Sequence, residues 1–579
     1  MTASPFPPPL TPDAARKPSS ENNLRAVTEQ FAQQEVAIRL GGGAKAIERQ
    51  HGKNRLTARE RIERLIDPGT PFQELGLWAA HGMYKEHGGA PGAGVVTGIG
   101  RVEGRLHMVI ANDATVKAGA FFPMTCKKII RAQQVAMAAR LPLIYLVDSA
   151  GVFLPMQEDV FPDTDDFGRI FRNNAVISAA GIPQISAIMG FCVAGGGYLP
   201  VLCDTLLMTE GSGLYLAGRA LVKAAIGQDA TEEELGGAQM HAQISGTIDF
   251  REPDDEACLR RVRSLVAKYP PTPTAARTMN EGTRAKLHSV RSGEDIYTIF
   301  KDKPGEQYDV KDIIACLVDA RGEPNAEGHT SLAPDFDEYK AEFGQSLVCG
   351  YATIGGHPCG IVANQGKLTQ RQLPGGKAGP SKSTNMPRVI YDDSADKAAR
   401  FIMDCNQRKI PLIFLHDTTG FMVGRDSEQG GIIRAGAKMV NAMSNCVVPK
   451  VVLIMGGSYG AGNYAMCGRA FDQFLAFAWP GSKCAVMGAA SASGTLAMIE
   501  EKSRERKGEA IDPETRDQIL AAVRDSYNEQ QDIRHGAARS WVDRIIEPHR
   551  TREELISALD AAAQGWNHEQ PFKTGVLQV

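Results

Sequence analysis

The 579-residue chain lacks several features that mark common functional classes. No apolar run approaches the roughly 20 residues that a membrane-spanning helix requires. The 64 Lys and Arg nearly balance the 67 Asp and Glu, and the formal net charge of -3 gives no general attraction to nucleic acid or to an anionic membrane. No G-x-x-x-x-G-K-[ST] phosphate loop occurs. We therefore expect no nucleic-acid partner, no membrane partner and no use of ATP by this chain.

Closely spaced cysteine pairs are also missing. None of the eleven cysteines belongs to a C-x-x-C motif, so we expect neither a zinc ribbon nor another metal site. Several cysteines lie in apolar segments, as buried thiols in a reducing compartment do: Cys192, Cys203, Cys316 and Cys349.

The N-terminal segment has no apolar signal core. Residues 1–22 are rich in proline and serine, and we predict that they form a disordered tail. Asp13 and Glu21 are uncommon in a transit peptide, so we expect the protein to be cytoplasmic. The rest of the chain is too long for one ordinary core, and 43% hydrophobic residues are typical of a globular protein with two domains.

The pattern of apolar residues indicates an α/β protein. Residues 24–40 have apolar side chains at helical spacing, and a second helix is predicted to start near Thr57. Thr57 and Glu60 form a capping-box pattern, and Pro68-Gly69 ends that helix. From about residue 92, short apolar segments alternate with amphipathic helices, which is typical of the α/β class.

An internal repeat is the most informative feature of the sequence. The segments 141–151 and 410–420 each read as a buried strand that runs into a glycine turn. In both, an aspartate (Asp148, Asp417) follows the proline by six positions and a glycine follows it by nine. A predicted helix precedes each segment, at 127–140 and at 395–409.

A second pair of matching segments follows. Ile182-Pro183 and Val448-Pro449 each lead into another strand and then into a turn of small residues. Twelve and thirteen positions after the proline stand Gly195-Gly196 in one copy and Ala461-Gly462 in the other. The chain is therefore a duplicated domain, and we divide it into an N-terminal domain, 23–300, and a C-terminal domain, 301–579. The stretch 365–394 interrupts the second copy; a solvated loop and a flap near the site are both open for it.

The two turns of small residues suggest a catalytic device. A strand followed by small residues and a helix directs backbone N–H groups into a cleft, and glycine lets a ligand approach closely. Two such groups that point at one oxygen form an oxyanion hole, which lowers a barrier by a few kcal/mol. Tight packing of strand on helix is the structural alternative. Two equivalent holes would suit a reaction with two anionic partners.

The first turn resembles that of the crotonase superfamily, which binds CoA thioesters. The resemblance lies in Ala194-Gly195-Gly196-Gly197-Tyr198-Leu199-Pro200 and in Cys203-Asp204. Crotonase-type hydratases carry a catalytic glutamate just after the glycines, where this chain has Tyr198 and Leu199. The hydratase activity is therefore disfavoured.

A broader resemblance is to carboxyltransferase β subunits, above all those of methylcrotonyl-CoA and geranyl-CoA carboxylases. It covers nearly all of residues 50–560, and Gly457-Ser458-Tyr459-Gly460-Ala461-Gly462-Asn463-Tyr464 is its most specific part. Further segments that carry it are 110–117, 159–163, 167–169, 221–225, 235–238 and 420–425.

The resemblance implies two tandem crotonase-like (ββα-spiral) domains with catalytic amides in each. Gly195 and Gly196 would hold the thioester oxygen as the acyl-CoA becomes an enolate. Ala461 and Gly462 would hold the ureido oxygen of biotin as CO2 departs. Because the biotin nitrogen can then act as the base, no Glu or His is nominated, and His416 is expected to be structural.

The resemblance also suggests substrate-binding residues. Asn463 and Tyr464 look methylcrotonyl-like, and Phe421 would line the acyl pocket, whereas segments 149–153 and 486–491 depart from the methylcrotonyl pattern. The acyl group therefore stays open among methylcrotonyl-, geranyl-, propionyl- and acetyl-CoA. Lys117 is predicted to bind the phosphates of coenzyme A, in a region that also holds Lys127, Lys128 and Arg131.

Partners follow from what the chain does not carry. It has no biotin-attachment Met-Lys-Met, so the resemblance implies that biotin is carried by a partner α subunit with biotin carboxylase activity. It also implies a homo-oligomer with cross-subunit sites, in a ring such as a hexameric core. Two other functions remain: the subunit of a glutaconyl-CoA-type decarboxylase, and a non-catalytic scaffold, which the intact glycines of both halves disfavour.

Overall fold

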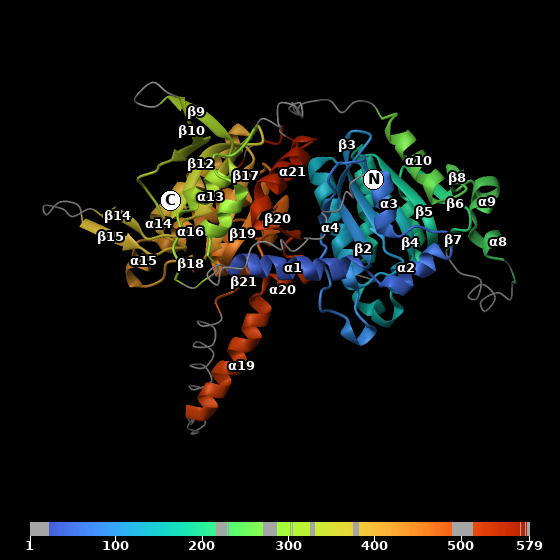
Figure 1. Cartoon of the computed structure of the whole chain (residues 1–579), viewed down its shortest axis with the longest axis horizontal. Helices are drawn as coiled ribbons and strands as arrows, with labels where there is room; N and C mark the ends of the chain where they lie inside the picture. The colour runs from blue at the N-terminus through green and yellow to red at the C-terminus, as the bar shows by residue number, and fades with distance from the viewer. Residues whose placement is uncertain are drawn as a thin grey trace, which may run out of the picture.

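The structure, a computed structural model, describes residues 23–161, 163–215, 229, 231–269, 287–301, 303, 305–324, 330–373, 381–488, 513–567, 569–571, 573 and 575. The predicted tail and the segments 221–225 and 489–491 lie outside these ranges. Two sheets with their helices lie side by side, one built from the first half of the chain and one from the second (Figure 1). Among the described residues, no helix has the length and apolar character needed to cross a bilayer.

The two sheets repeat one topology. In the first, the spatial order is β1 (Gln73–Leu75), β2 (Val95–Val102), β3 (Arg105–Asn112), β4 (Leu143–Ser149), β5 (Gln184–Val193), β6 (Thr205–Thr209) and β8 (Phe250–Glu252), with β7 (Gly213–Tyr215) beside β5. In the second, it is β11 (Phe336–Tyr339), β12 (Leu347–Ile354), β13 (His357–Asn364), β17 (Leu412–Thr418), β19 (Lys450–Tyr459), β20 (Leu475–Ala478) and β22 (Arg544–Ile545), with β21 (Lys483–Ala485) beside β19. The predicted duplication and α/β class are confirmed.

The helices occupy matching places as well. The four that flank the central strands are α4 (Pro123–Ala139), α5 (Phe167–Ala179), α14 (Asp392–Arg408) and α16 (Ile432–Ser444). Within the described residues, the other helices of at least eight residues are α1 (Asn23–Arg39), α2 (Ala44–His51), α3 (Ala58–Leu65), α10 (Asp255–Val266), α13 (Val310–Leu317), α19 (Pro513–Gln531) and α21 (Thr551–Ala563). The predicted capping box of Thr57 and Glu60 is present at α3, and α2 was not predicted.

The described residues also form shorter elements. Short α-helices are α6 (Tyr198–Val201), α8 (Glu232–Gly236), α9 (Ala238–Met240), α12 (Ile296–Ile299), α15 (Arg425–Gln429), α17 (Gly460–Ala465) and α20 (Ile533–Ala538). Small strands pair as β9 (Ala320–Pro324) with β10 (Thr330–Pro334), β14 (Thr369–Leu373) with β15 (Ser381–Asn385), and β16 (Val389–Ile390) with β18 (Gly420–Phe421). The stretch 365–394 thus holds strands β14 to β16, where the sequence left a loop or a flap open.

A duplicated aspartate closes the same hairpin in each half. Asp67 accepts the N–H groups of Glu103 and Gly104 in the β2–β3 turn, at 2.9 and 2.7 Å. Asp319 accepts those of Gly355 and Gly356 in the β12–β13 turn, both at 2.8 Å. These turns adjoin the starts of β3 and β13. They therefore lie at the end of each sheet where the parallel strands begin, opposite to the carboxyl ends of these strands.

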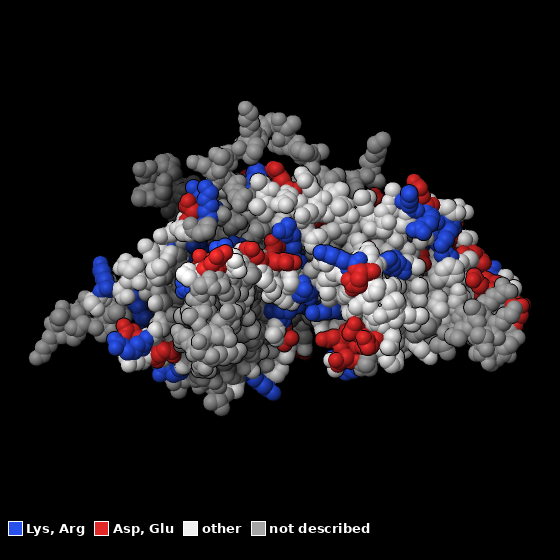
Figure 2. Space-filling view, turned by 90° about the horizontal axis from the view of Figure 1, so that it is seen from below, with Lys and Arg blue, Asp and Glu red and all other residues white. Residues whose placement is uncertain are grey.

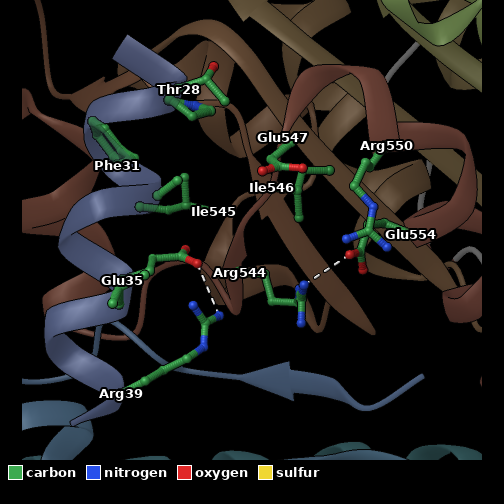
Figure 3. A pocket seen from close by; sticks show the side chains of 13 residues that line it. Thr28, Phe31, Glu35, Arg39, Arg544, Ile545, Ile546, Glu547, Arg550 and Glu554 are labelled. Carbon is green, nitrogen blue, oxygen red and sulfur yellow. Dashed lines mark hydrogen bonds and ion pairs between the residues drawn. The ribbon is translucent and has the colours of Figure 1, made fainter. Parts of the chain in front are cut away.

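Helix α1 ties the first half to the second, and in Figure 1 it lies across both. Its Phe31 belongs to a core cluster formed mainly by residues of the second half. Arg39 pairs with Glu35 at 3.0 Å and approaches Glu74 of β1 at 3.5 Å. The cleft that remains beside the helix has a volume of about 60 Å³, too small for an organic ligand (Figure 3).

Candidate active site

The two turns of small residues follow the central strands β5 and β19 in the same way. In the first half, a single 3-10 turn, Ala194–Gly197, leads into α6. Gly196 is buried, and a Cβ added to it would meet no atom closer than Gly151 Cα, at 3.7 Å. Packing alone therefore does not require glycine at position 196.

The second turn is the start of α17, and its two predicted residues differ. Ala461 is exposed in the first turn of this helix, where N–H groups have no intrahelical acceptor. Gly462 is buried, and an added Cβ would lie 2.8 Å from Thr418 Oγ1 and 2.9 Å from Gly420 Cα. Close packing thus explains the glycine at 462, whereas Ala461 is open to solvent and is not among the residues that line the adjoining pocket.

Exposed apolar side chains adjoin both turns. Tyr198 and Tyr464, which occupy equivalent positions after the turns, are each 52% exposed. Other large apolar side chains that are exposed are Leu154, Phe161 and Val201 in the first half, and Val423, Ile433 and Val486 in the second. Exposed aromatic rings at both turns suit contact with a partner or a ligand.

A basic cleft of about 580 Å³ opens at the carboxyl end of β4. Its cationic lining residues are Arg49, Lys53, Arg55 and Lys117. The backbone at Lys117 and Ala118 is left-handed, with φ of 47° and 54°, which is strained for two successive non-glycine residues. Lys117 thus lines a cleft whose cationic side chains suit an anionic ligand.

The sequence reasoning missed the other cations of this cleft. Arg49 and Lys53 lie on and just after α2, spaced by four residues, and both are exposed. Arg55 is held by the Gly211 carbonyl at 2.6 Å and stacks over the Phe191 ring at 4.9 Å. A basic helix end was the only signal in the sequence, and it became meaningful only with the fold.

Two of the basic residues near Lys117 point into the protein. Lys128 is buried and donates to the carbonyls of Gly92 and Val95, at 2.9 and 2.5 Å, and burial lowers its pKa to about 7. Arg131 is paired with Asp543 of the second half at 2.8 Å. Neither side chain can therefore reach the phosphates of coenzyme A, and Lys127, although exposed, does not line the cleft.

The second half has a pocket of about 290 Å³ beside α17, lined by Gly460, Asn463 and Tyr464. Asn463 donates to Ser458 Oγ at 2.8 Å, so its amide group supports the turn. Phe421 is half-buried and its ring would lie 3.1 Å from a Cβ on Gly436, so it packs against α16. Of these predicted substrate residues, only Tyr464 presents its side chain openly.

His416 is fully buried and lies 2.9 Å from Ser458 Oγ through Nδ1, while Nε2 contacts the Met466 carbonyl. Burial lowers its pKa to about 4, so the ring is neutral near pH 7. These contacts fit the structural role expected for it.

On the face drawn in Figure 2, basic and acidic side chains are intermixed, and no broad field of one sign spans the described residues.

Comparison with known proteins decides the family. The model of the carboxyl transferase domain matches residues 49–575. The chain belongs to this family. It is a carboxyltransferase, the enzyme subunit type of biotin-dependent acyl-CoA carboxylases, and the predicted family, fold and activity are confirmed.

Several carboxyltransferases resemble almost the whole chain. It is 41% identical over 554 residues to the biotin-dependent 3-methylcrotonyl-coenzyme A carboxylase beta1 subunit of Mycobacterium tuberculosis, covering 96% of this chain and 97% of that protein. It is 41% identical to the mitochondrial methylcrotonoyl-CoA carboxylase beta chain of Arabidopsis thaliana, covering 91% and 84%. The crystal structure of the geranyl-CoA carboxylase beta subunit of P. aeruginosa superposes with a TM-score of 0.80 at 33% identity, covering 99% of both chains.

Proposed function

We propose that this carboxyltransferase moves CO2 from carboxybiotin, carried by a partner α subunit, to a branched enoyl-CoA such as 3-methylcrotonyl-CoA. The observation that carries the proposal is the pair of equivalent amide turns, one in the half with a basic cleft and one beside a partly apolar pocket. The names of the M. tuberculosis and A. thaliana relatives support the acyl group.

The first half would bind the acyl-CoA. Lys117, Arg49 and Lys53 supply the positive charge that the CoA phosphates need, and Gly195 and Gly196 donate N–H groups to the thioester oxygen. Amides fixed in a closed turn need no reorganisation when that oxygen becomes negative. Such preorganisation is worth about 3–4 kcal/mol per donor in related sites.

The second half would receive biotin. Ala461, an exposed residue in the first turn of α17, and the pocket-lining Tyr464 and Val486 fit a ring system with one polar oxygen and an apolar body. When bound, carboxybiotin supplies the CO2 and a nitrogen base. The chain's part is to donate hydrogen bonds from Ala461 and Gly462, to orient the ring and to exclude water. His416 is buried and held on both nitrogens, so it cannot serve as the base.

Removal of charge from the basic cleft should weaken acyl-CoA binding. Replacing both Arg49 and Lys117 with alanine is expected to raise the KM for acyl-CoA by about tenfold and to leave kcat nearly unchanged, because phosphate contacts act equally on ground and transition states. Lys127→Ala is the matched control, since Lys127 is an exposed lysine outside the cleft. Equal KM values for the double variant and the control would remove this cleft from the site.

We propose a homo-oligomer in which each site joins the first half of one copy to the second half of another, within a larger assembly such as a hexameric core. The exposed apolar residues beside both turns support such a docking. Gly196→Pro and Ala461→Pro chains, each inactive alone, should then regain about a quarter of wild-type activity when they assemble together. About half of the subunit pairs are mixed, and in each mixed pair one of the two shared sites has both turns intact. Sites confined to one chain would give no recovery on mixing.

The substrate is tested with the partner present. The complex should be co-purified and supplied with ATP, bicarbonate and a panel of acyl-CoAs, and fixation should be fastest with a branched enoyl-CoA. Fixation into none of them, together with CO2 release from glutaconyl-CoA without ATP, would favour the decarboxylase function.

We also propose a cytoplasmic location, although the A. thaliana relative is named as mitochondrial.

A further inference from the structure

We infer that Asp148 and Asp417 are positioning residues, each of which fixes one amide turn and thereby governs one half of the carboxyl transfer. The inference rests on the proposed division of labour between the turns. Both aspartates belong to the sequence repeat, and neither donates a hydrogen bond to a substrate in the proposed mechanism, although Asp148 also lines the basic cleft. They lie at the ends of β4 and β17, beside the strands that carry the turns.

The strand pairs contain the same irregularity at these aspartates. Between β4 and β5 the partners step from Val147↔Ile188 to Ser149↔Cys192, so two residues of β4 span four of β5. Between β17 and β19 they step from His416↔Ile454 to Thr418↔Ser458, again two against four. Such bulges leave backbone groups without ladder partners, and they turn the chain that follows.

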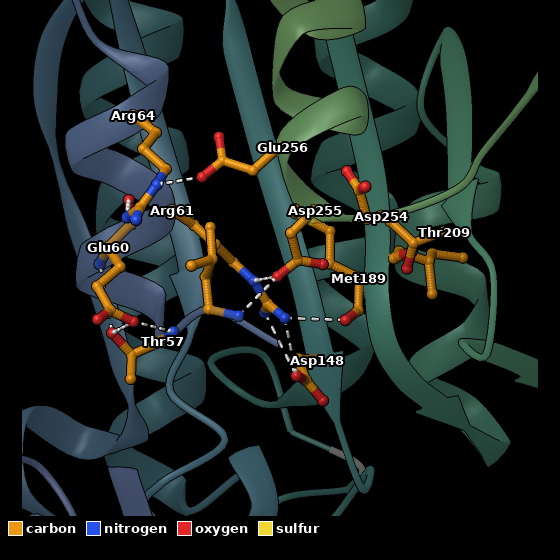
Figure 4. Close-up of polar contacts among 12 residues, drawn as sticks. Thr57, Glu60, Arg61, Arg64, Asp148, Met189, Thr209, Asp254, Asp255 and Glu256 are labelled. Carbon is orange, nitrogen blue, oxygen red and sulfur yellow. Dashed lines mark hydrogen bonds and ion pairs between the residues drawn. The ribbon is translucent and has the colours of Figure 1, made fainter. Parts of the chain in front are cut away.

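In the first half, Asp148 fills the bulge as part of a buried ion pair (Figure 4). Its Oδ1 accepts the N–H of Phe191 at 3.2 Å, and its Oδ2 lies 3.3 Å from both terminal nitrogens of Arg61. Arg61 also donates to the Met189 carbonyl at 2.8 Å and to Asp255 at 2.9 Å. One guanidinium thus holds the carboxylate and the bulged strand together.

In the second half, Asp417 fills the matching bulge with different partners. Its Oδ1 accepts the N–H of Gly457 at 2.9 Å. Its Oδ2 accepts the Tyr308 hydroxyl at 2.8 Å and Arg388 Nε at 2.5 Å. Burial and the nearby Asp417 both raise the pKa of Tyr308, which therefore stays protonated as a donor. The two aspartates can thus be perturbed separately.

The carboxylates occupy the space of missing side chains. A Cβ on Gly190 would lie 1.9 Å from Asp148 Oδ1, and one on Gly456 would lie 2.4 Å from Asp417 Oδ1. Each aspartate therefore needs a glycine opposite it. This fit leaves little freedom for the strand segment that precedes each turn.

The anchored amides precede the proposed catalytic ones by a few residues along the chain. Gly196 follows Phe191 by five residues, and Gly462 follows Gly457 by five. An oxyanion donor works only within a few tenths of an ångström of its place, and a 1 Å misplacement can cost about 100-fold in rate. Loss of one anchor should therefore slow the half-reaction of its own turn.

The experiment uses the complex with the α subunit and measures two rates. One is CO2 release from free N-carboxybiotin without acyl-CoA, which needs only the second turn. The other is the full transfer, with kcat and the KM for acyl-CoA. Asp417→Asn should slow CO2 release by at least about tenfold. The milder variant Tyr308→Phe, which keeps the ion pair between Asp417 and Arg388, should slow it as well. The KM for acyl-CoA should not change in either variant.

Asp148→Asn should affect the two rates in a different way. CO2 release from free carboxybiotin should stay within about twofold of wild type, while kcat of the full transfer falls by at least about tenfold. The matched controls are Asp67→Asn and Asp319→Asn. Each removes a carboxylate that accepts two backbone N–H groups and that lies at the opposite end of the parallel strands from the turns. Both controls should leave kcat per folded enzyme unchanged.

The inference would be overturned if Asp148→Asn and Asp417→Asn each slowed CO2 release and full transfer to the same extent. It would also be overturned if the control variants lost as much activity, because the aspartates would then only stabilise the fold. If the Asn variants fail to fold, an unchanged rate of CO2 release in Tyr308→Phe would do the same. Failure of the proposed function has a different signature, since the wild-type complex would then fix CO2 into no acyl-CoA.

Discussion

Proline at position 461 is expected to lower the rate of carboxyl transfer by about 100- to 1000-fold while the chain still folds. The substitution removes the N–H group of Ala461, which is exposed in the first turn of α17. Proline is tolerated in the first turn of a helix, because that N–H has no intrahelical acceptor. The loss should appear in kcat at saturating acyl-CoA, measured in the complex with the α subunit.

Ala461→Ser is the control, because it keeps the amide and adds only a hydroxyl to an exposed side chain. It should retain activity within a few-fold of wild type. Gly462 is a poorer test, since a Cβ there collides with Thr418 and Gly420 and would disturb packing as well. Full activity of Ala461→Pro in a folded complex would show that this amide has no part in the chemistry.

The repeat could be recognised from the sequence because the residues that define it have fixed physical tasks. Asp148 and Asp417 fill the bulges, and Gly190 and Gly456 leave the room for them. Spacing between these residues is set by strand geometry, so it recurs in both halves. The topology and the places of both turns were therefore predictable.

The partners of these residues were not predictable, because they come from distant segments. Arg61 and Asp148 are separated by 87 positions, and nothing local to either residue signals the pair. The same limit applies to Lys128 and Arg131, which lie on one helix with Lys127 yet point inward. Helical spacing indicated a basic surface there, whereas tertiary packing turned two of the three cations toward carbonyls and a carboxylate.

The contact of Arg131 with Asp543 is expected to be the strongest single link between the two halves. Asp543 is buried, and it also accepts the Ala476 N–H at 2.9 Å. Arg131→Met should destabilise the protein by about 1–3 kcal/mol, because the buried carboxylate loses its two hydrogen bonds from Arg131 and keeps only Arg469, at 3.4 Å, and the Ala476 N–H. The midpoint of urea denaturation should fall accordingly. Arg140→Met, on the exposed C-cap of the same helix, is the control and should have little effect.

Acid should break the ion pair between Arg131 and Asp543, and the direction of the change in stability follows from the pKa of Asp543. Burial raises the pKa of Asp543, but Arg131 and then Arg469 lower it further, to about 2, below the usual value of about 3.9 for an unfolded aspartate. A lowered pKa stabilises the fold above about pH 4, and that stability is lost as the pH falls toward 2, by about 2–3 kcal/mol in all. Asp543→Asn should therefore be less stable near neutral pH and lose less stability between pH 4 and 2 than the wild type. Urea denaturation at a series of pH values measures this, and parallel curves for the two proteins would show that another group carries the acid sensitivity.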